Sequence, residues 1–303
     1  MSLKKIVLSH KALYELYFFI KRKKINRKSL DKKLALLKNG QLKFPKNRQD
    51  ADVIVSLTSY GERLSDLKYT LLSLVLQSVK PEKVIVWIAI GEHIPEDLRI
   101  FEKYGIEFSF CKDILSYKKL IPALCEFSNK DIVTADDDIF YDRHWLKKLV
   151  DEKKKFPECI VAHIAHKVCF DSGGKLLPYN EWNHNVEQEK GSRLLFPTGV
   201  GGVLWNSTDF YKDICNEALF TKLAPKADDV WFYFMSAVMN GTKIKVVKSP
   251  CNQLRYVDIY KEYGLNGKST LASENVEQNL NDKQIANIMS YYGISDLRNI
   301  LEN

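Results

Sequence analysis

"DVIVSLTSYGERLSDLKYTLLSLVLQSVKPEKVIVWIAI" (residues 52–90) predicts the fold of this chain. Its first six residues form an apolar run typical of a strand. Residues 64–78 then carry apolar side chains at helical spacing, with Ser65 as a candidate cap. A second strand-like run follows at residues 83–90. A strand, a helix and a strand in this order indicate a parallel βαβ unit.

The same alternation continues toward the middle of the chain. Helices are expected around residues 95–104 and 118–127, and strands at residues 106–110 and 131–135. A chain of 303 residues with 45% apolar content can bury a full core. The sequence therefore predicts an α/β protein. Ligands of such proteins bind at the carboxyl ends of the parallel strands.

Three consecutive aspartates, Asp136, Asp137 and Asp138, follow the last of these strands. Side-chain alternation predicts that Asp136 and Asp138 point to one side and Asp137 to the other. Two carboxylates on one side suit a hard cation such as Mg²⁺ or Mn²⁺, which would also offset their repulsion. The alternative is an acidic loop at a helix start, with Asp142 as the cap of the next helix.

Two further patterns lie in the second half of the chain. FPTGVGGVLW (196–205) has three glycines in four residues, which allow a close backbone approach to a ligand or form a tight structural turn. Residues 226–244 predict a helix that begins at Asp228 and Asp229 and ends at Gly241. The two aspartates are either helix caps or functional carboxylates.

The positive charge is concentrated near the start of the chain. Residues 1–48 hold fifteen Lys or Arg and two acidic residues, so the rest is net negative although the whole chain is +8. LYELYFFIKRKK (13–24) favours either a helix on an anionic membrane surface or a segment packed on the core. Equal co-sedimentation with anionic vesicles after deletion of residues 1–48 would contradict the membrane alternative. No nucleic-acid partner is expected, because the basic stretch contains no recognisable DNA- or RNA-binding motif and the rest of the chain is net negative.

Cysteine usage and hydropathy indicate the compartment. The six cysteines form no CxxC pair, so we expect reduced thiols in a cytosolic protein. No apolar run reaches the ~20 residues that span a bilayer, and the N-terminal stretch does not fit a cleaved signal peptide. The expected location is the cytoplasm. If residues 1–48 bind a membrane, the protein would be attached peripherally to the inner face of the cell membrane.

The chain resembles the nucleotide-binding half of a GT-A fold glycosyltransferase, of the family 2-like type that builds bacterial surface polysaccharides in the cell envelope. The resemblance covers about residues 51–250. It depends on four motifs in order: VSLTSYGERL (55–64), LLSLVLQSVKPEKVIVWI (71–88), SYKKLIPAL (116–124) and the DDD triplet (136–138). It implies a Rossmann-like mixed sheet flanked by helices at 51–250, a basic, partly amphipathic helical extension at 1–50 and a helical tail at 251–303.

The resemblance also implies a reaction and a site. A sugar would move from a nucleoside diphosphate sugar, with UDP-sugars the expected donors, to a glycan or lipid-linked glycan, with inversion at the anomeric carbon. Mn²⁺ or Mg²⁺ would be held by a DXD element through Asp138 and Asp136, and Asp229, beside Asp228, would be the catalytic base. The implied donor-binding residues are Thr58, Tyr60 and Arg63 at the base and ribose, Lys119 at the base or diphosphate, Asp136 and Asp137 near the ribose, and Gly201 and Gly202 beside the sugar.

Some features depart from this family, and two other functions stay open. Some GT-A enzymes add a late histidine to the metal, but every histidine here precedes residue 185, so a third protein ligand is unidentified. His163 and His166 are expected in the core or lining the substrate site, and residues 179–185 suit either sugar stacking or an ordinary polar loop. The alternatives are a metal-dependent phosphohydrolase and a non-catalytic protein that binds carbohydrate or a membrane surface.

Overall fold

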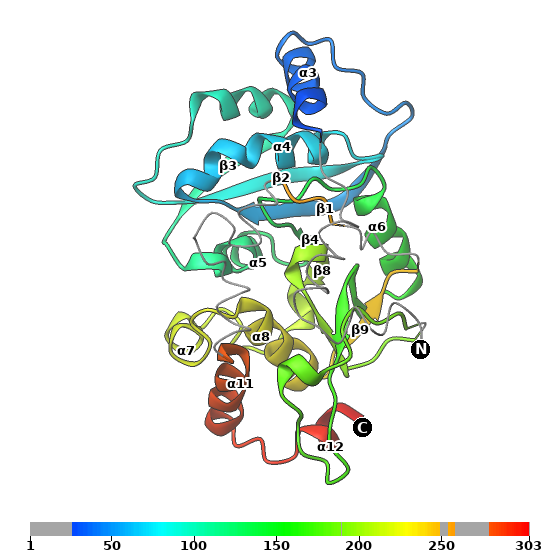
Figure 1. The fold of residues 1–303 in the computed structure, drawn as a ribbon, viewed down its shortest axis with the longest axis vertical. Coiled ribbons are helices and arrows are strands. Elements are labelled where there is room, and N and C mark those ends of the chain that lie inside the picture. Colours follow the sequence, from blue (N-terminus) through cyan, green and yellow to red (C-terminus); the bar gives the residue numbers. More distant parts are fainter. Residues whose placement is uncertain (1–25, 189, 249–253, 258–278, 303) are drawn as a thin grey trace, which may run out of the picture.

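The computed structural model describes residues 26–188, 190–248, 254–257 and 279–302 (Figure 1). A mixed sheet of seven strands in the order β3-β2-β1-β4-β8-β5-β9 forms its centre, and β6 pairs with β7 in a separate two-stranded sheet. The strands are β1 (Gln49–Thr58), β2 (Val79–Ala89), β3 (Ile106–Cys111), β4 (Asp131–Thr134), β5 (Cys159–Ala162), β6 (Ala165–Lys167), β7 (Leu195–Pro197), β8 (Val203–Asn206) and β9 (Lys243–Val246). The expected α/β fold with a mixed, helix-flanked sheet is confirmed, and it is Rossmann-like.

Helices cover this sheet. The α-helices are α3 (Arg27–Lys38), α4 (Leu64–Val75), α5 (Ile121–Glu126), α6 (Trp145–Lys155), α7 (Glu217–Leu223), α8 (Asp228–Tyr233), α11 (Leu280–Tyr291) and α12 (Leu297–Glu302). The 3₁₀ helices are η1 (Gly61–Arg63), η2 (Glu96–Tyr104), η3 (Leu115–Lys119), η4 (Tyr179–Glu181), η5 (Gly199–Gly201) and η6 (Ser207–Asp209), and η7 (Phe234–Val238) is a π-helix.

Three expected helices differ from the observed ones. The helix expected from Asp228 to Gly241 is α8 followed by the π-helix η7, which ends at Val238. The segment expected as a helix around 95–104 is the 3₁₀ helix η2, which ends at Gly105 in the left-handed region with φ 84°. The helix expected over 118–127 is split into η3 and α5. Pro122 lies in the first turn of α5, where its missing N–H costs nothing, and this favours a new helix start there.

The sheet topology brings β1 and β4 side by side at the centre. β1 pairs in parallel with both β2 and β4, with Ser56 opposite Thr134 and Thr58 opposite Trp87. β8 runs antiparallel to its two neighbours, β4 and β5. Because β1 and β4 point the same way, the residues after Thr58 and those after Thr134 meet at one edge of the sheet.

Alternating side chains of the central strands build a core on each face. Ile54 belongs to one hydrophobic cluster, whereas Val53, Val55 and Leu57 belong to the other. The first cluster includes residues of α5, α7, α8, α11 and α12, and the second includes residues of α3, α4 and α6. Figure 1 shows α3 and α4 above the β1–β3 half, and α7, α8 and α11 together at the other end. Both faces of the sheet are therefore covered.

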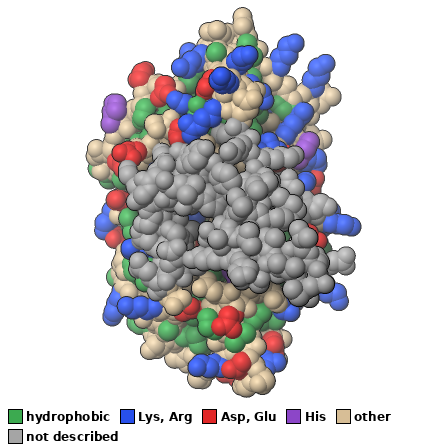
Figure 2. Space-filling model, viewed as in Figure 1, with side chains coloured by type: hydrophobic (Ala, Val, Ile, Leu, Met, Phe, Trp, Pro, Cys, Tyr) green, Lys and Arg blue, Asp and Glu red, His purple; other side chains and the backbone are tan. Residues whose placement is uncertain are grey.

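Part of the basic segment packs on the core. Leu30, Leu34 and Leu37 are buried along one side of α3, and the Tyr104 hydroxyl donates to the Leu37 carbonyl at 2.7 Å. The lysines of α3 are exposed, and Lys and Arg side chains gather over this region at the top of Figure 2. Residues 27–38 therefore pack on the core through the leucine side of α3. The LYELYFFIKRKK segment lies outside the described residues.

The end of the chain contributes two helices to the larger fold. Ile285, Ile288 and Leu297 are buried in the cluster that contains α8. The side chain of Gln284 accepts a hydrogen bond from the Lys226 amide at 2.9 Å, two residues before α8. α11 therefore fixes the chain just before the aspartates at the start of α8. None of the helices in the described ranges has the length and apolar character that a bilayer crossing requires.

Candidate active site

Asp137 is the buried centre of the aspartate triplet. Its side chain accepts a hydrogen bond from Ser59 Oγ at 2.6 Å, and from Arg63 Nε at 2.9 Å. The Thr70 hydroxyl donates to the Asp137 carbonyl at 2.7 Å, which ties the triplet to α4. Only 6% of Asp137 is exposed. This aspartate therefore anchors Arg63 at the edge of the sheet.

Arg63 also contacts the next aspartate. Its Nη2 atom lies 2.7 Å from Asp138 Oδ2, so one guanidinium neutralises both Asp137 and Asp138. Burial lowers the pKa of Arg63, but the two carboxylates outweigh it and raise the pKa above its ordinary value. The expected alternation of the three aspartates is wrong here, because β4 ends at Thr134 and the triplet is not extended strand.

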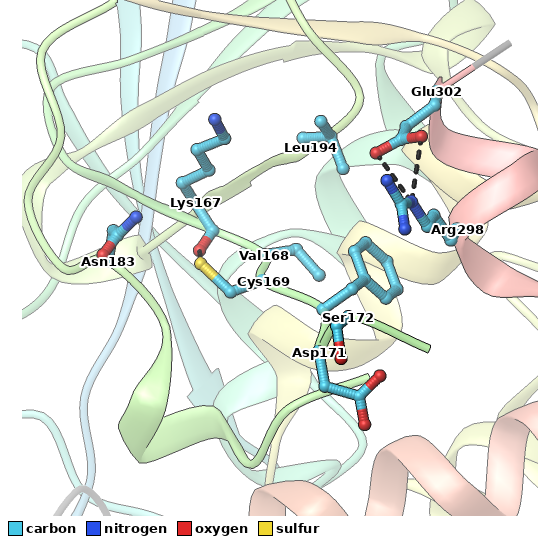
Figure 3. Close-up of a pocket in the computed structure, with 10 residues that line it drawn as sticks. Lys167, Val168, Cys169, Asp171, Ser172, Asn183, Leu194, Arg298 and Glu302 are labelled. Atoms are coloured by element: carbon cyan, nitrogen blue, oxygen red, sulfur yellow. Dashed lines mark hydrogen bonds and ion pairs between the residues drawn. The ribbon is translucent and has the colours of Figure 1, made fainter. Parts of the chain in front are cut away.

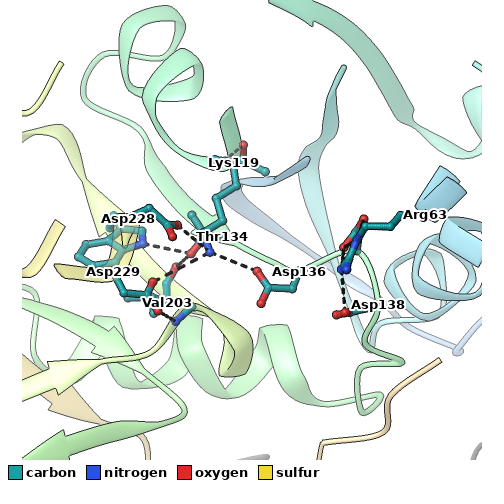
Figure 4. Close-up of polar contacts among 12 residues, drawn as sticks. Arg63, Lys119, Thr134, Asp136, Asp138, Val203, Asp228 and Asp229 are labelled. Carbon is teal, nitrogen blue, oxygen red and sulfur yellow. Dashed lines mark hydrogen bonds and ion pairs between the residues drawn. The ribbon is translucent and has the colours of Figure 1, made fainter. Parts of the chain in front are cut away.

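Lys119 lies among three carboxylates at the centre of the site (Figure 4). Its Nζ atom is 3.2 Å from Asp136 Oδ1, 3.0 Å from Asp228 Oδ2 and 4.0 Å from Asp229 Oδ1. The Ser56 hydroxyl of β1 donates to the Lys119 carbonyl at 2.7 Å and holds the end of η3 in place. Burial opposes the charge on Lys119, but the carboxylates raise its pKa well above the usual value. The amine is therefore a fixed cation.

Asp229 is the carboxylate of this cluster whose pKa is raised. Its Oδ2 atom accepts a hydrogen bond from the Gly199 amide at 3.1 Å, and 31% of its side chain is exposed. Burial raises its pKa to about 7, to which the charges of Asp228 and Asp136 contribute, while Lys119 and the Gly199 amide act against the rise. A carboxyl group with this pKa can release and take up a proton near neutral pH.

The helix-cap alternative for Asp228 and Asp229 is wrong in this structure. Ala227 is the N-cap of α8, and no side chain caps the helix end. Asp142 also differs from the expected cap, since α6 has His144 at its N-cap position. Asp142 instead accepts a hydrogen bond from the His144 amide at 2.9 Å and pairs with Arg255 at 3.3 Å. Both aspartates of α8 are thus directed toward Lys119 rather than their own helix.

The glycine loop approaches the site through Gly199 rather than through the expected Gly201 and Gly202. A Cβ atom at Gly199 would lie 2.6 Å from Lys119 Nζ and 2.9 Å from Asp229 Oδ1. At Gly201 it would meet the Ile164 side chain at 2.8 Å, and at Gly202, where φ is 93°, the Trp145 ring at 2.5 Å. The geometry thus places Gly199 against the charged groups, and Gly201 and Gly202 against the core.

Thr58 is the last residue of β1 at the same edge, and Tyr60 follows it two positions later. The Thr58 hydroxyl donates to the Trp87 carbonyl at 2.8 Å, and the Arg63 guanidinium lies 5.8 Å from the centre of the Tyr60 ring. Tyr60 is 50% exposed, and Ile90 and Leu115, from the end of β2 and the start of η3, are exposed as well. The exposed ring of Tyr60 therefore lies beside the charged cluster at Arg63.

The histidines of the sheet region are buried, as expected for core residues. One ring nitrogen of His163 lies 2.9 Å from the Trp145 carbonyl, and burial lowers the pKa of His163 to about 4. Burial lowers the pKa of His166 to about 3, and its ring lies 4.2 Å from that of His184. Trp182 is only 4% exposed, so it offers little surface for sugar stacking.

Asp136 and Asp138 at the edge of the sheet could bind a divalent cation only if water or a bound substrate supplied further oxygen ligands. Asp136 and Asp138 have side chains 26% and 34% exposed, and their oxygens are the donor type that Mg²⁺ and Mn²⁺ prefer. Within the described ranges, no three His, Cys, Asp or Glu side chains are grouped to hold a metal ion. A cation bound to these two aspartates would complete its shell with water and phosphate oxygens.

A separate cavity of 460 Å³ lies near the C-terminal helix α12 (Figure 3). Lys167, Asp171 and Asn183 line it from one side, and the ion pair of Arg298 with Glu302, at 3.1 Å, lines it from the other. Asn183 belongs to the 179–185 segment considered for sugar stacking, but none of the residues expected to bind the donor or a metal, or to act as the base, lines this cavity. The charged cluster around Lys119 is therefore a different place in the molecule.

Comparisons with known proteins give only distant structural similarity. No family model matches the sequence, and neither does any curated protein. The chain is similar to the 2-C-methyl-D-erythritol 4-phosphate cytidylyltransferase of Thermus thermophilus, with 13% identity, a TM-score of 0.42, and coverage of 72% of this chain and 97% of that one. It is also similar to residues 1–349 of S. aureus TarS, with 14% identity, a TM-score of 0.41, and coverage of 83% and 73%. A third similar structure is the inositol-1-phosphate CTP transferase of T. maritima, with 14% identity, a TM-score of 0.36, and coverage of 67% and 86%.

Proposed function

We propose that this chain is a family 2-like GT-A glycosyltransferase that moves a sugar from a nucleoside diphosphate sugar, with UDP-sugars as first candidates, to a glycan or lipid-linked glycan. The observation that carries the proposal is Asp229, a carboxyl group whose pKa is raised to about 7, in a cluster with Lys119 at the carboxyl ends of β1 and β4. Such a group suits proton removal from an acceptor hydroxyl. The site would lie at the cytoplasmic face of the cell envelope.

In the proposed reaction, Asp229 takes the proton as the acceptor oxygen attacks the anomeric carbon. Attack opposite the leaving diphosphate inverts that centre. Its exposed fraction of 31% leaves the carboxylate open to an incoming hydroxyl. Asp228, 3.0 Å from Lys119, keeps the amine next to Asp229, and this orders the cluster before the substrate arrives.

Arg63 and Lys119 supply positive charge where the diphosphate would leave. Asp137 fixes the guanidinium of Arg63 through two nitrogen atoms, so little side-chain entropy remains to be lost on binding. Tyr60, stacked near Arg63, offers its exposed ring to the base. Asp136 and Asp138 would hold Mg²⁺ or Mn²⁺, and that ion would act as a Lewis acid on the diphosphate.

A panel of nucleoside diphosphate sugars tests the proposal, with and without Mn²⁺. A transferase releases nucleoside diphosphate in step with a glycosylated acceptor, whereas the alternative phosphohydrolase cleaves the diphosphate linkage with water and releases nucleoside monophosphate and sugar 1-phosphate. A non-catalytic binding protein shows a thermal shift with a ligand but releases none of these products. Release of nucleoside monophosphate and sugar 1-phosphate, or binding without any turnover, would overturn the transferase proposal in favour of the corresponding alternative.

Asp138→Asn is expected to weaken metal-dependent binding of nucleoside diphosphate by about tenfold or more, because the amide lacks the charge that offsets the cation's lost water. Titration calorimetry with and without Mn²⁺ measures this. The matched control is Asp142→Asn, since Asp142 follows the triplet but pairs with Arg255 instead. If Asp138→Asn binds the nucleotide like the parent under both conditions, Asp138 is not a metal ligand.

Gly199→Ala is expected to lower transfer by roughly 10²-fold, because a misplacement of about 1 Å in a catalytic group can cost that much. The new Cβ would lie within 3 Å of both Lys119 and Asp229 and would force them apart. Gly173→Ala is the control, since its Cβ meets only an ordinary contact at 3.4 Å. Initial rates and Tm should be measured for both variants. Equal rates for the two would show that the loop does not position the cluster.

A further inference from the structure

Two exposed cysteines lie against each other outside the candidate active site. Cys125 is in the last turn of α5, and Cys215 is in the turn before α7; both are exposed free thiols. Their sulfur atoms are 3.6 Å apart, although the residues are separated by 90 positions in the sequence. An S–S bond is about 2.05 Å long, so the sulfurs need to approach by about 1.5 Å.

Neighbouring contacts keep the two segments together. The Tyr117 ring stacks on Phe220 with centroids 4.2 Å apart, and the Tyr117 hydroxyl donates to the Ala224 carbonyl at 2.6 Å. Figure 1 shows α5 above α7 and to its right. The thiols are thus held near each other by buried contacts that do not involve them.

Thiol–disulfide exchange requires a thiolate as the attacking group, and Cys125 is suited to supply it. The hydrogen bond with Cys215 lowers the pKa of Cys125 against the opposing effect of burial, and this favours the Cys125 thiolate. Burial raises the pKa of Cys111, and it raises that of Cys159 to about 11. Among these thiols, Cys125 is the nucleophile that a disulfide reagent should meet first.

We propose that Cys125 and Cys215 form a reversible intramolecular disulfide by exchange with a small-molecule disulfide. The Cys125 thiolate attacks one sulfur of the reagent, a mixed disulfide forms, and the first small thiolate leaves. Cys215 then gives up its proton and attacks the Cys125 sulfur, which releases the second small thiolate. The two cysteines are oxidised by two electrons, and the reagent is reduced to two thiols. The covalent bond would fasten α5 to the chain before α7.

Oxidised glutathione and the full chain provide the test, and no nucleotide is needed. The expected result is an intact mass lower by two hydrogen atoms, a peptide map that links Cys125 to Cys215, and a Tm raised by several degrees, because the bond closes a long loop. Dithiothreitol should reverse all three changes. Cys169→Ser is the matched control and should behave like the parent.

The Cys215→Ser variant separates the proposed pair from general thiol oxidation. It should stop at the mixed disulfide, with one glutathione on Cys125 and without the rise in Tm. Three outcomes would overturn the proposal: separate glutathione adducts on both cysteines of the parent, a link between other cysteines, or an unreacted Cys125. The result does not depend on the proposed transferase activity.

Discussion

Asp229→Asn is expected to lower kcat by roughly 10²-fold or more, while donor affinity changes little and Tm does not fall. The proton that Asp229 would accept moves only in the transition state, so its loss affects the chemical step rather than binding. The Asn side chain keeps an oxygen that can accept from the Gly199 amide, which lies 3.1 Å from Asp229 Oδ2. Transfer rates, titration calorimetry and thermal melts measure the three quantities.

Two further variants show whether a loss of kcat is specific to Asp229. Asp228→Asn tests the neighbouring carboxylate, and Asp296→Asn tests an exposed aspartate that accepts a hydrogen bond from the Asn299 amide at the start of α12. Asp296→Asn should match the parent. If Asp228→Asn alone loses kcat, the base has been assigned to the wrong member of the pair. If both site variants turn over normally, the base lies elsewhere.

The same group predicts how the protein depends on pH. The pKa of Asp229 is raised to about 7, so kcat/KM should fall as pH drops below about 7, where the carboxylate gains a proton. The folded state keeps this proton when the unfolded chain, with an ordinary pKa near 4, has released it. The parent should therefore lose stability as pH rises from about 4 to 7. Asp229→Asn should lose less over that window.

Lys119→Met is expected to lower the free energy of unfolding by about 3–5 kcal/mol, the usual cost of removing one partner from a buried ion pair. The amine is within 3.2 Å of both Asp136 and Asp228, and these carboxylates would remain without it. Transfer activity should be lost as well, because the proposed diphosphate site loses its cation. Urea unfolding monitored by circular dichroism measures the stability.

Lys130→Met is the matched control for Lys119→Met. Lys130 also pairs with two carboxylates, Asp52 at 2.6 Å and Glu82 at 2.7 Å, but its side chain is at the surface. Its replacement should cost far less, since water screens exposed charges. The double variant Lys119→Met with Asp228→Asn should recover part of the lost stability. Equal stability of Lys119→Met and Lys130→Met would show that the charges in the cluster are not desolvated.

The hydrophobic pattern of consecutive residues was sufficient to predict the alternation of strands and helices in the first half of the chain. Apolar runs such as residues 52–57 and the helical spacing at 64–78 depend on side-chain periodicity, which is a property of consecutive residues. The start of α8 at Asp228 and the position of the triplet after β4 were predictable for the same reason. These features placed Asp136–Asp138 at the carboxyl end of a parallel strand.

Which charges pair with which was decided only by the tertiary structure. Lys119 ends η3 and Asp228 begins α8, yet the fold brings their charged groups to 3.0 Å, and the glycine loop just before β8 brings Gly199 to Asp229. The predicted alternation of the Asp136, Asp137 and Asp138 side chains was wrong because β4 ends at Thr134. Asp137 and Asp138 both pair with Arg63 instead. Ion pairs and close backbone approaches depend on distances between segments far apart in the chain, and periodicity does not encode those distances.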